Sequence, residues 1–186
     1  MNEVTIIGTV NTIPSYHHSY EEEKFYSSTL ITARTSGVLD EIPVLISEYF
    51  LKEFEPYTPV EINGELRSYN QNGKVLLNVF VNVVSEAKYA DEDSIVIEGH
   101  LCKEPRYRFT PKGREITDLL LAVNRRYGKT DYIPCVCWGA NARKTQTFSC
   151  GDEVRVIGRI QSRTYEKEGI ERITYEVSVY EIERLE

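Results

Sequence analysis

Two stretches of this chain, IIGTVNTIP (Ile6–Pro14) and IEGHLCKEP (Ile97–Pro105), share glycine and proline at the same spacing, 91 residues apart. The same offset aligns Leu30 with Leu121, Arg34 with Arg125, Gly37 with Gly128, and Asp40–Pro43 with Asp131–Pro134. Further along, VEINGELRS (Val60–Ser68) matches VRVIGRIQS (Val154–Ser162) at an offset of 94, which a three-residue insertion explains. Matches that keep their order indicate a duplicated domain of about 90 residues.

Each copy alternates apolar and polar residues with the period of a β-strand rather than a helix, as at Val4, Ile6, Gly8 and Val10. Glycine within such a strand is typical of a bulge or a sharp bend. Residues 70–73 and 166–169 are expected to be hairpin loops. We expect one short helix per copy between strands three and four, after Ser47 in the first copy and, more weakly, over Asn141–Phe148 in the second. Five strands and one helix predict a small closed barrel, since closure removes exposed edges.

The domains are therefore expected at residues 1–88 and 94–186, joined by the polar stretch Glu86–Asp93. The 186 residues are 41% hydrophobic and 27% charged, which is ordinary for a soluble globular chain. The sequence contains neither a long apolar run nor the basic start of a secretory signal, so we expect a cytoplasmic protein without a membrane partner.

The four cysteines favour reduced thiols over a disulfide framework or a metal site. Cys135 and Cys137 alternate with Ile133 at strand spacing, which suggests small buried residues. A zinc site would normally show paired C-x-x-C-like ligands, which are absent. Because no nucleophile elbow, phosphate-binding glycine loop or HExxH motif occurs, we expect neither an enzyme nor a cofactor; a zinc or thiol enzyme is the alternative that metal analysis would test.

The third strand of the second copy, Asp131–Trp138, carries the candidate functional residues. If Ile133, Cys135 and Cys137 face inward, Tyr132, Pro134, Val136 and Trp138 face outward. Tyr127 precedes this strand, and Tyr165 lies near the end of strand four. The basic residues of this copy that accompany these rings are Arg106, Arg108, Lys112, Arg114, Arg125, Arg126, Arg155, Arg159 and Arg163. Rings that stack on bases and cations that neutralise phosphates are what binding of a single nucleic-acid strand requires.

The first copy lacks these features at the matching positions: Glu41 replaces Tyr132, Ser47 replaces Trp138 and Ser36 replaces Tyr127. Glu61 and Glu65 stand where the second copy has Arg155 and Arg159. Residues 1–91 carry 6 basic and 13 acidic side chains, net −7, whereas residues 92–186 carry 16 of each. We therefore expect the second copy to bind and the first to be mainly structural. A solvated face, or a surface that contacts other proteins, is the alternative explanation of the same rings and charges.

At this level of detail the second copy resembles the bacterial single-stranded DNA-binding proteins of the OB-fold type. Ile95–Val123 resembles the opening of that family, with a glycine in the strand, a proline and a P-x-G turn. YIPCVCWG (Tyr132–Gly139) resembles its aromatic third strand, and Gly151–Val179 its G-x-x-V block, aromatic hairpin and last strand. The resemblance implies two tandem five-stranded OB barrels in an all-β chain.

The resemblance also implies that Tyr127, Tyr132, Trp138 and Tyr165 stack on bases, and that Arg106, Arg125 and Arg163 contact the nucleic-acid backbone. The implied function is sequence-tolerant binding of single-stranded DNA in replication, recombination or repair. Members of the family commonly assemble four OB domains, which this chain would reach as a homodimer. The family usually ends in an acidic tail that recruits replication proteins, whereas this sequence ends at VYEIERLE (Val179–Glu186), so that route to such partners is in doubt. An adapter similar to primosomal replication protein N is the alternative function.

Overall fold

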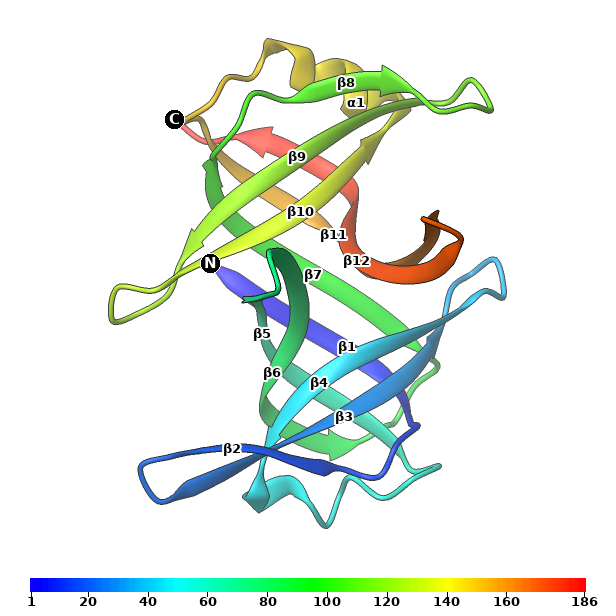
Figure 1. Ribbon diagram of the computed structural model, residues 1–186, viewed down its shortest axis with the longest axis vertical. Coiled ribbons are helices and arrows are strands. Elements are labelled where there is room, and N and C mark those ends of the chain that lie inside the picture. Colours follow the sequence, from blue (N-terminus) through cyan, green and yellow to red (C-terminus); the bar gives the residue numbers. More distant parts are fainter. The chain divides into compact units, whose positions relative to one another are not determined.

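The computed structural model describes residues 1–186, which form twelve strands and three short helical segments (Figure 1). The first six strands are β1 (Asn2–Val10), β2 (Ser15–Tyr20), β3 (Glu23–Ala33), β4 (Leu39–Ser47), β5 (Pro59–Gln71) and β6 (Lys74–Glu86). The other six are β7 (Glu92–Leu101), β8 (Arg106–Phe109), β9 (Glu115–Asn124), β10 (Thr130–Trp138), β11 (Glu153–Lys167) and β12 (Ile170–Arg184). The helical segments are the 3-10 turns η1 (Glu48–Phe50) and η2 (Thr145–Thr147) and the helix α1 (Gly139–Lys144).

The chain divides into two compact units. One contains Glu3–Arg67 and Leu77–Ser94, and the other contains Met1–Asn2, Ser68–Leu76 and Ile95–Glu186. The tip of the β5–β6 hairpin thus belongs to the unit formed mainly by the C-terminal repeat, although its sequence lies in the N-terminal repeat. We call the two the N-terminal unit and the C-terminal unit.

In the N-terminal repeat the strands follow the order β2-β3-β4-β6-β5-β1, and β1 also pairs with β3. Val10 lies opposite Leu30 in that second pairing, while Ile6 lies opposite Ile62 on β5. β4 and β6 run parallel, whereas β1 pairs antiparallel with β3 and β5, and β3 pairs antiparallel with β2 and β4. The inward side chains, among them Ile6, Leu30 and Ile62, are fully buried and form the core of this repeat.

The C-terminal repeat repeats this connectivity as β7-β11-β12-β10-β9-β8, with an additional β7–β9 pairing that places His100 opposite Ala122. Gly99 lies beside this pairing, where a side-chain Cβ would stand only 2.7 Å from the carbonyl oxygen of Ala122. Gly158 has a similar position at a bulge of β11, with the Ser178 carbonyl 2.3 Å from a Cβ. The bulge at Gly158 agrees with the sequence prediction, and both glycines allow the backbones to approach closely.

The hairpin loops at residues 70–73 and 166–169 are confirmed. Asn72 and Gly73 both have positive φ angles, as do Glu168 and Gly169, which is the geometry of a two-residue turn matched to strand twist. Residues 87–91 lie between β6, which ends at Glu86, and β7, which begins at Glu92.

Two expectations about the elements were wrong. Each repeat has six strands rather than five, because the short strands β2 and β8 pair with the outer edges of β3 and β9. The relative size of the helices is reversed: the first repeat has only the turn η1, capped by the Ser47 hydroxyl, whereas the second has α1 followed by η2. Burial of Ala142 and Thr145 anchors the second segment, while Phe54 is buried beyond the end of the first.

Candidate nucleic-acid interface

Strand β10 presents two of the candidate rings on its outer side. Ile133, Cys135 and Cys137 are buried in the core, whereas Tyr132 is 45% exposed and Trp138 is half-buried. The two rings are six residues apart on one face, which corresponds to about 20 Å at ~3.3 Å per residue. A single strand that touches both rings would therefore have to run along β10.

The alternation predicted that the whole outer face of β10 is exposed. The structure differs in the middle of the strand. Val136 is buried. Its cross-strand neighbours are Asp118 on β9 and Ser178 on β12, and Arg108 reaches Asp118 from β8. Because cross-strand neighbours share a face, these polar side chains cover the middle of the strand and leave the rings at its two ends.

The other two candidate rings lie away from the face of β10. Tyr127 stands in the turn between β9 and β10 with a positive φ angle and a fully exposed ring. Tyr165 is half-buried near the end of β11, where it lies opposite Arg172. The four rings thus belong to one unit but to three separate segments of it.

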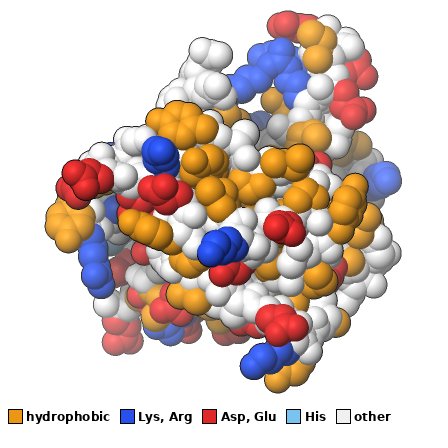
Figure 2. All heavy atoms as spheres, turned by 90° about the horizontal axis from the view of Figure 1, so that it is seen from below, with side chains coloured by type: hydrophobic (Ala, Val, Ile, Leu, Met, Phe, Trp, Pro, Cys, Tyr) orange, Lys and Arg blue, Asp and Glu red, His pale blue; other side chains and the backbone are white.

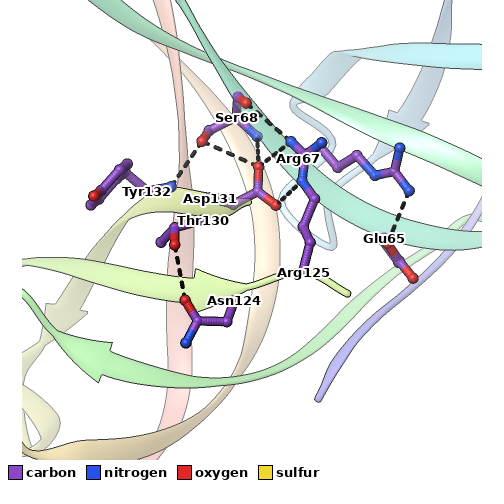
Figure 3. Close-up of polar contacts among 8 residues, drawn as sticks. All are labelled: Glu65, Arg67, Ser68, Asn124, Arg125, Thr130, Asp131 and Tyr132. Carbon is purple, nitrogen blue, oxygen red and sulfur yellow. Dashed lines mark hydrogen bonds and ion pairs between the residues drawn. The ribbon is translucent and has the colours of Figure 1, made fainter. Parts of the chain in front are cut away.

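Arg125 occupies a fixed position in a network next to Tyr132 (Figure 3). Its guanidinium donates from Nε and Nη2 to the two carboxylate oxygens of Asp131, at 2.6 and 2.5 Å. Asp131 is fully buried and also accepts from the backbone N–H of Ser68 at 2.6 Å. The Ser68 hydroxyl in turn accepts from the backbone N–H of Tyr132 at 2.8 Å. This network holds Arg125 by charge-assisted bonds, so its main contribution is to order the start of β10.

The N-terminal repeat contains the same ion pair at the matching positions. Arg34 donates to Asp40 at 2.5 and 2.6 Å, and Asp40 is almost fully buried. The aligned residues Arg34 and Arg125, which the sequence repeat had paired, therefore have the same structural partner in both repeats. A bidentate arginine–carboxylate pair at this position is a property of the duplicated fold and is not specific to the repeat that carries the rings.

Several of the other candidate arginines also have acidic or polar neighbours. Arg108 forms a fork with Asp118 at 2.7 and 3.2 Å, and this hydrogen bonding raises the pKa of Arg108. Arg155 bonds Glu98 and Glu183, and Arg163 lies 3.5 Å from Glu176. Arg159 contacts Gln161 at 3.4 Å and lies 6.0 Å from the Tyr180 ring centroid. The acids that balance these arginines explain how the repeat can be rich in cations without a net charge.

Several exposed cations without an ion pair lie at a strand end or in the turns beside the sheet. Among the candidate arginines, Arg106 and Arg126 are exposed and make no salt bridge. The exposed cations of the adjoining turns that also make no salt bridge are Lys112, Arg114 and Lys129. These groups can approach phosphates without first breaking an internal pair.

Phe109 is a ring that the sequence analysis did not single out. It is 61% exposed at the end of β8 and lines an open groove of about 580 Å³ with Trp138, Arg114 and Glu115. Glu115 is paired with Arg143 and accepts from the Tyr107 hydroxyl at 2.7 Å, so its charge is balanced within the unit. The strand-like run Arg106–Phe109 beside the P-x-G turn was the signal that would have identified this ring.

The N-terminal unit has a different outer face. Glu41, at the position of Tyr132, accepts hydrogen bonds from Asn11 and Thr29 at 3.0 and 2.9 Å. The Phe80 ring is covered by the Arg67 guanidinium, 3.5 Å from its centroid, and is not left free to stack. This unit does expose rings elsewhere, including Tyr16, Tyr20, Tyr49 and Tyr57. The face in Figure 2 shows hydrophobic side chains over a broad area with single acidic and basic groups among them.

The cysteines are free thiols, and the prediction that Cys135 and Cys137 are buried strand residues is confirmed. Burial raises the pKa of Cys137 to about 12 and that of Cys135 well above its usual value. Histidine, cysteine and acidic side chains form no cluster of three or more that could hold a metal ion. The structure has no helix with the length and apolar character needed to cross a membrane.

Strand β10 thus carries the exposed Tyr132 ring toward one end and the half-buried Trp138 ring at the other, and cations without an ion pair lie in the adjoining turns. Residues 92–185 match the Single-strand binding protein family, and the chain belongs to this family. The single-stranded DNA-binding protein of Clostridium tetani is 41% identical over 100 residues, which cover 50% of this chain and 69% of that protein. Single-stranded DNA-binding protein A of Bacillus subtilis is 35% identical over 86 residues, covering 42% of this chain and 50% of that protein.

The fold of the whole chain also has a solved counterpart. The wild-type single-stranded DNA binding protein from Thermus aquaticus superposes with a TM-score of 0.80 at 22% sequence identity, covering 100% of this chain and 93% of that chain. The chain is thus a mostly-β protein with the fold of that OB-fold family. Its family consists of binding proteins without enzymatic activity, so the protein is not an enzyme.

Proposed function

We propose that the protein binds single-stranded DNA without strong sequence preference, through the C-terminal repeat. The observation that carries this proposal is the placement of Tyr132 and Trp138 at the two ends of the outer face of β10, in the part of the chain that matches the family. Bases would stack on these rings and on Tyr127 and Tyr165. Stacking tolerates any base because every base has a π-face, which accounts for the weak sequence preference.

The cations have two roles in this proposal. Arg106 and Arg126, which have no salt bridge, would contact phosphates directly and release counterions. Arg163 is 53% exposed and has one contact of 3.5 Å to Glu176, so it can exchange this contact for a phosphate. Arg108, Arg125, Arg155 and Arg159 already have partners and would act mainly through the field around the site.

The proposal includes the organisation of the chain. The strand pairings that return on themselves in each repeat support two tandem OB barrels, with the domain at residues 1–88 mainly structural and the domain at residues 94–186 binding. Four OB domains would then require a homodimer, which size-exclusion chromatography with light scattering can detect; a monomer at micromolar concentration would remove this part. Replication, recombination or repair in the cytoplasm is the setting in which such a protein would act, with replication proteins as further partners.

The test is a titration of the protein with oligo-dT at two salt concentrations. The chain has one tryptophan, so quenching of its fluorescence reports on Trp138 directly. We expect quenching and an affinity that falls with salt by a log–log slope of about −0.7 for each phosphate contact on a single strand. Duplex DNA should compete poorly, because its bases cannot reach the rings.

A matched pair of variants locates the site. Tyr132→Ala keeps the tryptophan signal and should weaken binding by about 1–3 kcal/mol, the value of one base–ring stack. Tyr49→Ala removes a ring that is 74% exposed in the N-terminal unit and should leave the affinity unchanged. Equal effects of the two variants, or none from Tyr132→Ala, would move the interface away from β10.

A further inference from the structure

The tip of the β5–β6 hairpin, Ser68–Leu76, comes from the N-terminal repeat but belongs to the C-terminal unit. The two ends of this segment lie beside two of the candidate rings, Tyr132 and Tyr165. We expected this repeat to be mainly structural, because the rings of its own third strand are replaced. The contacts of the hairpin tip assign it a direct part in the site.

The first contact is at Tyr132. Strand β10 pairs with β9 over Thr130–Trp138, but it pairs with β12 only over Cys135–Cys137. The N-terminal part of β10 therefore has an edge that β12 does not cover, and Ser68 bonds to this edge. The Ser68 hydroxyl accepts a hydrogen bond from the Tyr132 N–H at 2.8 Å and lies 3.3 Å from a carboxylate oxygen of Asp131 (Figure 3). The backbone N–H of Ser68 donates to the same oxygen at 2.6 Å.

These bonds fix the backbone from which the Tyr132 ring projects. The hydroxyl of Ser68 bridges a backbone donor and a fully buried carboxylate, so its removal leaves both without this partner. Arg125 also donates to the Ser68 carbonyl oxygen at 3.3 Å, which ties the hairpin to the same ion pair. Ser68 is thus a positioning residue for the ring.

The second contact is a groove of about 530 Å³ beside Tyr165. Lys74, Val75 and Leu76 form one wall, and Tyr165, Arg172, Ile173 and Thr174 form the other. Tyr165 and Arg172 are directly opposite each other in the β11–β12 register. The Nε atom of Arg172 is buried without a hydrogen-bond partner, and no acidic side chain lines the groove.

We infer that the hairpin tip of the N-terminal repeat completes the single-strand site of the C-terminal repeat. A base of the bound strand stacks on Tyr165, and the adjoining phosphates lie against Lys74 and Arg172, while Ser68 holds Tyr132 in position. The occupant is single-stranded nucleic acid because the groove combines a ring with two cations and continues the interface proposed above. This inference rests on the proposed function.

The test of the groove is Lys74→Gln, measured by anisotropy of a labelled oligo-dT over a range of salt concentrations. Loss of one phosphate contact should weaken binding and reduce the magnitude of the salt slope by about 0.7. Lys52→Gln removes an exposed lysine of the N-terminal unit and should change neither quantity. Because Lys74 is exposed at a hairpin tip, its replacement does not endanger folding.

The test of Ser68 separates positioning from general stability. Ser68→Ala should weaken binding about 2- to 10-fold without a change of salt slope, and Ser68→Thr, which keeps the hydroxyl, should restore the affinity. In the background of Tyr132→Ala, the Ser68→Ala change should have little further effect, since it acts through that ring. Ser85→Ala, on an exposed serine of β6 in the N-terminal unit, is the control.

Binding by the wild-type protein with quenching of Trp138 fluorescence would support the proposed function. If Lys74→Gln then keeps the full salt slope and Ser68→Ala binds normally, the role of the hairpin is refuted and the proposed function stands. Additive effects of Ser68→Ala and Tyr132→Ala would likewise refute positioning of that ring. If the wild-type protein itself does not bind oligo-dT, the proposed function fails and takes this inference with it.

Discussion

Replacing Asp131 by alanine should lower the free energy of unfolding by about 3–5 kcal/mol, the usual result of removing one partner of a buried ion pair. Asp131 is fully buried and accepts three hydrogen bonds shorter than 2.7 Å, two from Arg125 and one from the Ser68 backbone. The Arg125 side chain is 22% exposed, so water can solvate part of the charge left behind. We therefore expect a loss near 3 kcal/mol, at the lower end of this range.

Asp118 provides the matched control because it forms the same type of fork with Arg108. It is 38% exposed, and exposed pairs contribute about 0–1 kcal/mol. Asp118→Ala should therefore destabilise the protein far less than Asp131→Ala, although both remove a bidentate carboxylate. Burial, and not the number of bonds, is the variable that the comparison isolates.

The assay is urea denaturation followed by circular dichroism, with thermal melts in parallel. For a chain of this length, each kcal/mol of lost stability lowers Tm by about 2–4 °C, so a loss near 3 kcal/mol in Asp131→Ala should lower Tm by about 6–12 °C. The double variant Asp131→Ala/Arg125→Ala should lose less unfolding free energy than the two single variants lose together, because it leaves no uncompensated charge. A loss below 1 kcal/mol, or equal losses for Asp131→Ala and Asp118→Ala, would refute this reasoning.

Three further predictions concern other parts of the chain. Phe109→Ala should weaken oligo-dT binding by about 1–3 kcal/mol if a base enters the groove beside Trp138, and an unchanged affinity in anisotropy titrations would exclude that groove from the path of the strand. Cys150 is exposed and should react first with a thiol reagent at pH 8, whereas Cys137, whose pKa of about 12 keeps it protonated there, should react only after denaturation; mass spectrometry of the labelled peptides would show the order. Gly158→Ala should destabilise the protein by about 1–3 kcal/mol, because its Cβ would stand 2.3 Å from the Ser178 carbonyl oxygen, and a wild-type melting curve would contradict this account of the bulge.

The family and much of the local structure could be predicted because their signals are local or periodic. Alternation placed Ile133, Cys135 and Cys137 in the core and Tyr132 on the surface, since side chains on a strand point to opposite faces in turn. The hairpin turns at Asn72–Gly73 and Glu168–Gly169 followed from residues that tolerate a positive φ angle. The internal repeat predicted that both halves share one connectivity, and the order of the strands shows that they do.

The partners of the charged residues could not be predicted in this way. Arg125 was counted among the cations available to DNA, but it is bonded to Asp131 and to Ser68, which lies 57 residues away in the chain. Val136 was expected outside, yet it is buried, with Asp118 of β9 and Ser178 of β12 as its cross-strand neighbours. Alternation specifies the face that a residue occupies and says nothing about what covers that face.

The sequence by itself determined the duplication, the all-β fold, the family and the repeat that keeps the aromatic residues, because these depend on residue order and on the two-residue period of a strand. Only the tertiary structure decided which arginines form ion pairs, that the Phe109 ring lies beside Trp138, and which unit contains the β5–β6 hairpin tip. Those outcomes depend on contacts between residues that are far apart in the chain, such as Ser68 with Asp131, and folding alone brings such residues within hydrogen-bonding distance.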